Sequence, residues 1–234
     1  KGKSINDAKF VLQCSPDVLV SDGNPVYSEK SSPGSTFANC NAHARRRFVD
    51  ASKVAPNKIS DVIIKLYENL YKVEKEIAWM SSSERLRRRR QESKPIFEKI
   101  KSHLESAALK VDPKSTLGDA ISYFLKHEEK LKVFLERGEI EIDNNAAERR
   151  QRCPVMGRKN FQGFRSIDGA DIGMFFYSLI ESCKTNGLDP TAYFLEMAIR
   201  KLKDETIETP YNYACRLKSK IYTEENMKLQ GPTP

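Results

Sequence analysis

The feature that most constrains the fold is continuous helical patterning from about residue 57 to residue 137 of a 234-residue chain. Apolar side chains recur there three and four positions apart, which is the spacing that places them on one face of an α-helix. The first such stripe comprises Ile59, Val62, Ile63, Leu66, Leu70, Val73 and Ile77. A long amphipathic helix is therefore predicted at the start of this segment.

Two further helices are predicted in the same segment. The second begins near Ser81, where Ser81-x-x-Glu84 resembles a capping box, and it continues beyond Pro95. The third is predicted from Ser115 to Arg137, and Gly138 ends it. The whole segment is thus predicted to be helical, inserted between two regions of different character.

The region before the helical segment alternates between short strands and short helices. Strands are predicted at 18–20 and 36–40, and helices at 5–14 and 42–51. The first strand is stopped by a cluster of turn-forming residues that begins at Ser21. Asp22 is therefore expected just past the carboxyl end of a strand, where open α/β sheets present their ligands.

The region after Gly138 is predicted to return to shorter elements. These are an extended piece at 139–142, helices at 144–152, 170–186 and 190–203, and a polar, irregular tail at 204–234. Asp143 can cap the first of these helices, and Pro154 is expected to end it. The helix at 170–186 is apolar nearly all round, which predicts the central core helix. The fold class is accordingly α/β and predominantly helical.

Composition restricts the partners and the compartment. The net charge is +8 and the isoelectric point is about 9.1, which favours a polyanionic partner, a bias that ribosomal and membrane-surface proteins share. The cysteines are odd in number and scattered, at Cys14, Cys40, Cys153, Cys183 and Cys215. That pattern favours a reducing, cytoplasmic location over a disulfide framework. No apolar run approaches the roughly 18 residues of a membrane span, so no membrane association is expected.

Two carboxylates, Asp22 and Glu148, are the candidates for a metal site. Each is predicted at the end of an element, and two carboxylates together with phosphate oxygens are a ligand set that Mg²⁺ prefers. Other interpretations stay open: Asp22 as an ordinary turn residue, and Glu148 as the partner of Arg152 one helical turn later. Cys40-x-x-His43 has the spacing of half a zinc site, but structural zinc needs four ligands and no second pair follows at a suitable spacing, so a buried thiol beside a polar histidine is favoured. His43 is also a candidate contact to a scissile phosphate or to attacking water.

Three basic clusters are candidates for contacts with phosphate. Arg45-Arg46-Arg47 continues the helix of His43, and a denser run comprises Arg85 and residues 87–90. Acidic neighbours make a solvated helical face an equal interpretation of the denser run. The third cluster is Gly157-Arg158-Lys159-Asn160-Phe161, in which a glycine, two cations, an amide and an aromatic are typical of a nucleic-acid contact loop.

Taken together, these motifs resemble the catalytic region of the insertion sequence 66 family of transposases, which are DDE enzymes with a ribonuclease H-like core. The resemblance covers most of the chain. It rests on Ser21-Asp22-Gly23 with Tyr27, Cys40-x-Ala42-His43-Ala44-Arg45-Arg46-x-Phe48, Ser93-Lys94-Pro95, Asp143-Asn144-Asn145-x-x-Glu148-Arg149, Gly157-Arg158-Lys159-Asn160 and Tyr177-Ser178-Leu179-Ile180-Glu181.

The resemblance implies a domain plan and a chemistry. The plan is a partial ribonuclease H-like core at 1–52, a helical insertion at 53–138, the rest of the core at 139–203 and a polar tail at 204–234. Asp22 would be the second catalytic aspartate and Glu148 the catalytic glutamate, both binding Mg²⁺ or Mn²⁺ for cleavage and strand transfer, with His43 beside them. Contacts to the insertion-sequence ends and target DNA would come from Arg45, Arg46, Arg149, Arg152, Arg158, Lys159 and Asn160. A homo-oligomer on DNA would be expected.

The sequence also departs from the family pattern. Asn24 and Asn41 replace aromatic residues, Pro154 falls one position late, and Arg165 stands where glycine is usual. The first catalytic aspartate and the opening strands would precede Lys1. We therefore expect a truncated piece of a longer protein, a missing part supplied by another chain, or strands paired in another way. A non-catalytic helical protein for DNA binding or assembly is the alternative, and a scaffold with no nucleic-acid role is a third.

Overall fold

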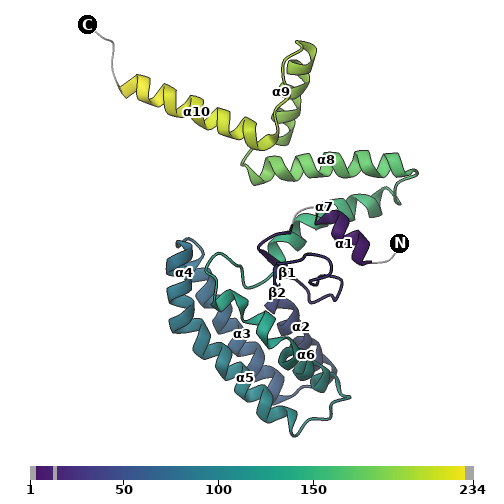
Figure 1. The fold of residues 1–234 in the computed structure, drawn as a ribbon, viewed down its shortest axis with the longest axis vertical. Helices are drawn as coiled ribbons and strands as arrows, with labels where there is room; N and C mark the ends of the chain where they lie inside the picture. Colours follow the sequence, from purple (N-terminus) through teal and green to yellow (C-terminus); the bar gives the residue numbers. More distant parts are fainter. Residues whose placement is uncertain (1–3, 13–14, 230–234) are drawn as a thin grey trace. The chain divides into compact units, whose positions relative to one another are not determined.

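A computed structural model describes residues 4–12 and 15–229 (Figure 1). The chain divides into two compact units, Lys1–Ala146 and Ala147–Pro234. Helices account for most of both, so the α/β, predominantly helical class is confirmed. No helix in the described part of the chain has both the length and the apolar character needed to cross a membrane.

The first unit contains a small parallel sheet of two strands, β1 (Val18–Ser21) and β2 (Thr36–Asn39). Their register pairs Val18 with Thr36 and Ser21 with Asn39, so both strands end at the same edge. The two predicted strands are thus confirmed. The short helix α1 (Ile5–Val11) precedes them, and the last two positions of its predicted extent lie outside the described residues.

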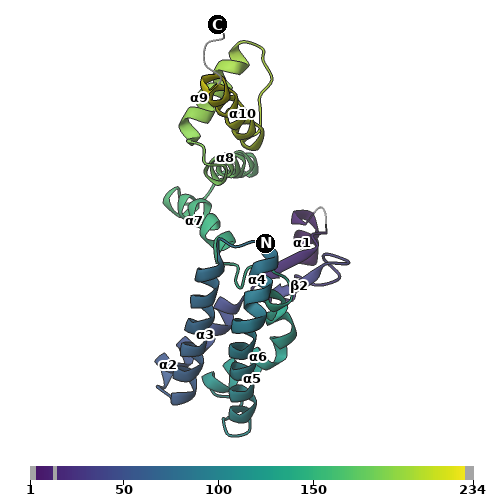
Figure 2. The same cartoon turned by 90° about the vertical axis from the view of Figure 1, so that its left-hand side faces the viewer.

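Helices form the larger part of the first unit (Figures 1 and 2). They are α2 (Asn41–Val54), α3 (Lys58–Ile77), α4 (Ser82–Arg88), a π-helical turn η1 (Arg89–Ser93), α5 (Lys94–Ala108), α6 (Thr116–Leu131) and a 3₁₀ turn η2 (Val133–Leu135). Helix α2 packs against α3 and α6, and α5 packs against the same two helices. The predicted helical segment and the helix at 42–51 therefore share one core.

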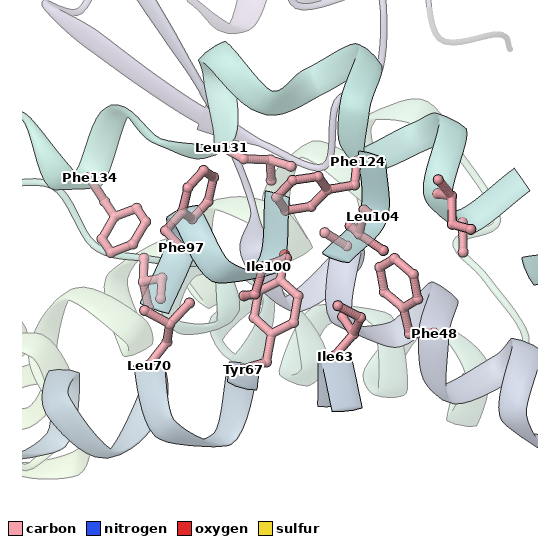
Figure 3. Packing of buried hydrophobic residues seen from close by; sticks show 14 of the residues in the cluster. Phe48, Ile63, Tyr67, Leu70, Phe97, Ile100, Leu104, Phe124, Leu131 and Phe134 are labelled. Carbon is pink, nitrogen blue, oxygen red and sulfur yellow. The ribbon is translucent and has the colours of Figure 1, made fainter. Parts of the chain in front are cut away.

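The core of this unit consists of apolar side chains from α2, α3, α5, α6 and η2, which point into one shared space (Figure 3). Phe97 lies 5.4 Å from Phe124 and 6.3 Å from Phe134, measured between ring centroids. Ile63 and Leu70 come from the predicted stripe of α3 and are fully buried. Burying each such side chain contributes about 1.5–3 kcal/mol, so this cluster provides much of the unit's stability.

Side-chain caps begin the long helices of this unit. Asn57 accepts a hydrogen bond from the Ser60 amide, Ser81 from the Glu84 amide, and Ser115 from the Gly118 amide. The Ser81 hydroxyl also donates to the Glu84 carboxylate at 2.9 Å. Ser81 was predicted to begin a helix, and the structure confirms it. Each cap satisfies an amide that the helix itself leaves without a partner.

The arginine run at 85–90 has a structural role at its centre. Arg89 is fully buried, and its guanidinium donates to both carboxylate oxygens of Glu74 at 2.8 and 2.5 Å. Its Nη1 also donates to the carbonyl oxygens of Phe134, Arg137 and Ile140 at 2.7–3.0 Å. A phosphate contact is therefore wrong for Arg89, because its donors are already bound inside the core.

The neighbours of Arg89 form ion pairs as well. Arg85 lies 2.9 Å from Glu141, and Arg88 pairs with Glu92 and Glu76. These ion pairs agree with the alternative interpretation, in which the run is a helical face with acidic partners. Only the burial of Arg89 was outside both predictions.

The third predicted helix ends earlier than expected. Helix α6 stops at Leu131, and η2 follows in place of the last predicted turn. Phe134 and Leu135 are buried there, and Arg89 holds the Phe134 and Arg137 carbonyls. At the end of α6 itself, the Leu135 amide donates to the Lys132 carbonyl in a 3₁₀ turn, and the Leu131 carbonyl accepts from Asn41 Nδ2.

The second unit consists of α7 from Ala147 onward, α8 (Ile167–Thr185), α9 (Pro190–Leu202) and α10 (Pro210–Leu229). Its small core comprises Cys183, Tyr193 and Met197. Asp189 accepts a hydrogen bond from the Ala192 amide and so caps α9, as predicted. The predicted irregular tail is wrong for residues 210–229, which are helical.

Helix α7 (Asn145–Asn160) runs through Pro154, so the predicted end before Pro154 is wrong. Proline removes one backbone donor and deprives the Arg150 carbonyl of its helical partner. Most of α7 is exposed, and water can solvate the freed carbonyl there. The proline is therefore accommodated within the helix.

Helix α8 is apolar nearly all round, but it is not a buried core helix. Ile172 and Phe175 are each 59% exposed and Phe176 is 47% exposed, and Cys183 is the one residue of α8 classed as buried. The prediction that this helix forms the central core is wrong for the described chain. The pattern of apolar residues predicts an apolar helix surface, but it does not specify what covers that surface.

We predict that Arg89→Met lowers the free energy of unfolding by about 3–5 kcal/mol, because it leaves Glu74 charged and buried without its partner. Urea denaturation followed by circular dichroism measures this change. Arg90→Met is the matched control, since Arg90 is exposed and its substitution should change stability by less than about 0.5 kcal/mol. Equal effects of the two substitutions would contradict the role assigned to Arg89.

Candidate metal and nucleic-acid site

Asp22 lies immediately after β1, at the edge where both strands end. Its side chain is exposed, and its Oδ1 accepts a hydrogen bond from the Asn24 amide at 3.0 Å. Gly23 has a φ of 84°, a conformation that glycine adopts without strain. The sequence prediction placed Asp22 here, and the geometry is a tight turn that presents a carboxylate to solvent.

Helix α6 contacts the backbone of this turn. The Tyr123 hydroxyl donates to the Asp22 carbonyl oxygen at 3.1 Å. The guanidinium of Arg47 lies 4.1 Å from the centroid of the Tyr123 ring, and it pairs with Asp119 at 2.7 Å. No local pattern in the sequence points to Tyr123, because its partner Asp22 lies 101 positions away.

Cys40 is a buried thiol at the start of α2. Its backbone amide donates to the Ser21 carbonyl at 2.8 Å, and its sulfur accepts from the Asn144 amide at 3.3 Å. Burial raises the pKa of the Cys40 thiol, which keeps it protonated. His43 lies half-buried on the same helix. The buried-thiol interpretation is confirmed, and Cys40 connects the Asp22 strand to the segment before α7.

Asn41 occupies a position where the family pattern has an aromatic residue. It is fully buried, and its Nδ2 donates to the carbonyl oxygens of Leu131 and Ile142 at 2.9 and 3.2 Å. The Tyr67 hydroxyl donates to its Oδ1 at 3.4 Å. Asn41 therefore links α2 to the end of α6 and to the chain that leads into α7, a role that sequence reasoning missed.

Asp143 holds the beginning of α7 against α3. Its Oδ2 accepts from the Tyr71 hydroxyl at 2.9 Å, and its Oδ1 accepts from the Asn145 amide at 2.9 Å. Burial raises the pKa of Tyr71, and the Asp143 charge adds to that effect, so the hydroxyl remains a donor. Asp143 thus accepts a hydrogen bond from the backbone amide of the first residue of α7, which is close to its predicted role as a helix cap.

Glu148 is half-buried on α7, in the second unit. Asp22 belongs to the first unit, so the pairing of these two carboxylates on one metal stays a prediction. Among the described residues there is no group of three or more histidine, cysteine or acidic side chains arranged to hold a metal ion. Asp22 alone fits a hard cation as one carboxylate ligand, because its side chain is exposed and oriented.

Arg45 and Arg46 lie on α2 at a cavity of about 670 Å³, which Lys53, Glu68 and Tyr71 also line. Arg45 is half-buried and lies 3.5 Å from Glu68, whereas Arg46 is exposed. The surface offers cations to an anion, with Glu68 and Asp50, which also lines the cavity, as partial counter-charges. This arrangement suits contact with a phosphate backbone better than recognition of bases.

The remaining predicted contacts are on α7, and all are exposed: Arg149, Arg152, Arg158, Lys159 and Asn160. The predicted loop at 157–160 is wrong, because these residues form the last turn of the helix. The chain turns afterwards, where Gln162 and Gly163 have φ values of 55° and 95°. The cations of this segment are nevertheless available on the helix surface.

Gly157 has a packing role, and the predicted close approach of its backbone to a ligand stays a prediction. A Cβ atom there would lie 1.7 Å from the Tyr177 hydroxyl oxygen, so α7 and α8 are in close contact at this point. A larger residue would require Tyr177 to move. The absence of a side chain at Gly157 therefore permits close packing of α7 against α8 within the second unit.

A family profile described as Transposase IS66 family matches residues 2–172. The chain belongs to this family. The match includes every predicted site residue, from Asp22 through Asn160, and it ends within α8. Membership of the IS66 family thus confirms the resemblance that the motifs indicated.

Relatives of known sequence come from Sinorhizobium fredii (strain NBRC 101917 / NGR234). The uncharacterized protein y4jD is 30% identical over 226 residues, covering 91% of this chain and 44% of that protein. The uncharacterized proteins y4hP and y4qI are 33% and 31% identical, covering 70% and 78% of this chain and 32% and 35% of their own lengths. This IS66-family chain therefore spans less than half the length of each, and no solved structure matches it.

We predict that Cys40 and Cys183 react with iodoacetamide at least about tenfold more slowly than Cys153 and Cys215, because the first pair is buried and the second exposed. Peptide-resolved mass spectrometry of the native chain over time measures the four rates. The control is the same experiment in urea, where the four rates should converge. Equal reactivity of Cys40 and Cys153 in the native chain would contradict the buried position of Cys40.

Proposed function

We propose that this chain is part of a transposase that cleaves DNA at insertion-sequence ends and joins the freed strand to a target. The observation that carries the proposal is Asp22, an exposed carboxylate at the end of a parallel strand inside the region that matches the transposase family. Open α/β sheets present ligands at such an edge, and carboxylates there can hold the metal ions of phosphoryl transfer. The ribonuclease H-like core, the helical insertion and a cytoplasmic location are parts of this proposal.

The proposed metal is Mg²⁺ or Mn²⁺, with Asp22 and Glu148 as ligands. When bound, such an ion activates water and stabilises the leaving oxygen of a phosphodiester. Asp22 supplies an oriented carboxylate, because the Asn24 amide binds one of its oxygens. Glu148 supplies the other from α7, whose beginning Asp143 fixes.

The proposed role of the cations is to position the DNA backbone. Arg45 and Arg46 present guanidinium groups at the α2 cavity, and His43 precedes them on the same helix. The α7 contacts are Arg149, Arg152, Arg158, Lys159 and Asn160. Such contacts supply affinity and register but no sequence readout by themselves.

A second candidate function is DNA binding or assembly without catalysis. The exposed apolar side chains of α8 favour it, because a large exposed apolar surface is typical of a site for protein association. A homo-oligomer on DNA is compatible with both functions. Strand cleavage and DNA binding must therefore be measured separately.

We expect the chain to bind duplex DNA with an affinity that falls steeply with salt. Arg46→Ala should lower the slope of log affinity against log salt by about one, because each lost phosphate contact releases about one counterion fewer. Fluorescence anisotropy across a salt series measures this slope. Lys99→Ala is the control, because Lys99 is an exposed cation outside all three basic clusters, and a slope change of the same size would contradict the assignment of Arg46.

Strand cleavage tests the catalytic proposal directly. The protein to test is a longer chain whose added amino-terminal segment supplies a third carboxylate. We expect this longer chain to nick insertion-sequence ends in the presence of Mg²⁺. Glu148→Gln should reduce that rate by roughly 100-fold or more, since the charge stabilisation provided by a metal is worth several kcal/mol. Glu205→Gln, a change of the same type at an exposed position, is the control. Equal cleavage by the Glu148→Gln variant and the unsubstituted protein would exclude the assignment.

A further inference from the structure

The turn that carries Asp22 is supported by a helix from the predicted insertion. The Tyr123 hydroxyl of α6 donates to the Asp22 carbonyl at 3.1 Å. A Cβ atom at Gly23 would lie 3.0 Å from that hydroxyl and 3.1 Å from Asn39 Nδ2. The backbone at Asp22 and Gly23 therefore lies directly against Tyr123, and a side chain at Gly23 would press against it.

Tyr123 is itself held in place by α2. The Arg47 guanidinium lies 4.1 Å from the centroid of its ring, within the range of a cation–π interaction. The same guanidinium pairs with Asp119, one helical turn earlier on α6, at 2.7 Å. The His127 ring packs 4.7 Å from the Tyr123 ring on the other neighbouring turn. Contacts with Arg47 and His127 thus restrict how the Tyr123 ring can move.

The electrostatics keep the hydroxyl a donor. Burial raises the pKa of Tyr123 against the opposing effect of Arg47, so the phenol stays protonated at neutral pH. Burial, together with nearby Lys126, Lys130 and Arg47, lowers the pKa of His127, so that ring is neutral there. The contact with the Asp22 carbonyl is therefore present throughout the neutral range.

A metal-ligating carboxylate must be held in orientation by its surroundings, since small misplacements weaken a site strongly. The Asn24 amide orients one oxygen of Asp22, and Tyr123 binds the backbone carbonyl of the same residue. Among residues 4–12 and 15–229 the structure records no bond to the second side-chain oxygen. The turn thus presents an oriented oxygen to a ligand.

We propose that Tyr123, held by Arg47, is a positioning residue for Asp22, so that the helical segment between the two catalytic carboxylates orients a metal ligand. In this role Tyr123 acts through the backbone of the Asp22 turn. The metal part of this inference rests on the proposed function. The support of the turn by α6 does not.

Amide hydrogen exchange tests the support of the turn without any metal. Tyr123→Phe removes only the hydroxyl and keeps the ring beneath Arg47. Exchange at the amides of Gly23 and Asn24 should become about five-fold faster, the factor that corresponds to one net hydrogen bond. Tyr211→Phe is the matched control, because Tyr211 is 65% exposed, and it should leave these amides unchanged. Unchanged exchange in Tyr123→Phe overturns the inference.

Manganese titration of the full chain, followed by nuclear magnetic resonance, tests the consequence for the metal. Mn²⁺ should broaden the Gly23 and Asn24 signals, Asp22→Asn should abolish this, and Tyr123→Phe should raise the midpoint concentration by about five-fold. A purely structural role would lower stability without moving that midpoint. Loss of broadening in Asp22→Asn with an unchanged midpoint in Tyr123→Phe overturns the positioning role alone. Broadening that survives in Asp22→Asn contradicts the proposed metal role of Asp22, and no broadening in the unsubstituted chain counts against both.

Discussion

The first unit depends on one buried ion pair. Arg89 donates to both oxygens of Glu74 on α3, and it also holds carbonyl groups of the segment that follows α6. A buried guanidinium is tolerated only when its donors are satisfied, so these partners must stay together. These contacts follow the end of α6 at Leu131, and they hold the path of the chain toward Asp143. The segment that leads to Glu148 is therefore anchored in the helical core.

The candidate site depends on that anchoring through a second set of contacts. Buried Asn41 bonds the carbonyls of Leu131 and Ile142, and Cys40 accepts from the Asn144 amide. The same two residues follow β2, whose end lies beside that of β1. Cys40 and Asn41 thus join the Asp22 strand, the helical segment and the beginning of α7. Helix α6 adds the Tyr123 contact to the Asp22 turn, so the helical segment is structurally continuous with the edge that carries the carboxylate.

Several elements could be predicted because their determinants are local. The stripe of α3, the caps at Ser81 and Asp189 and the turn at Asp22 each depend on residues close in the sequence. The failures share a different cause. Pro154 was expected to end α7, but a solvated helix accommodates it. Arg89 was expected among exposed cations, but it is buried, where it pairs with Glu74 from a distant part of the sequence. Residues 157–160 were expected in a loop, but they form the last turn of α7, where Gly157 faces Tyr177 of α8.

The sequence alone determined the family, the helical character, the basic surplus and the position of Asp22 at the end of a strand. These follow from motif order, periodicity and charge, which are properties of the chain read in one dimension. Only the tertiary structure decided that Arg89 is buried, that Asn41 and Cys40 join separate segments, that the α8 side chains are exposed and that Tyr123 supports Asp22. Each of these depends on which distant groups meet, and burial and hydrogen-bond satisfaction between residues far apart in sequence have no local pattern.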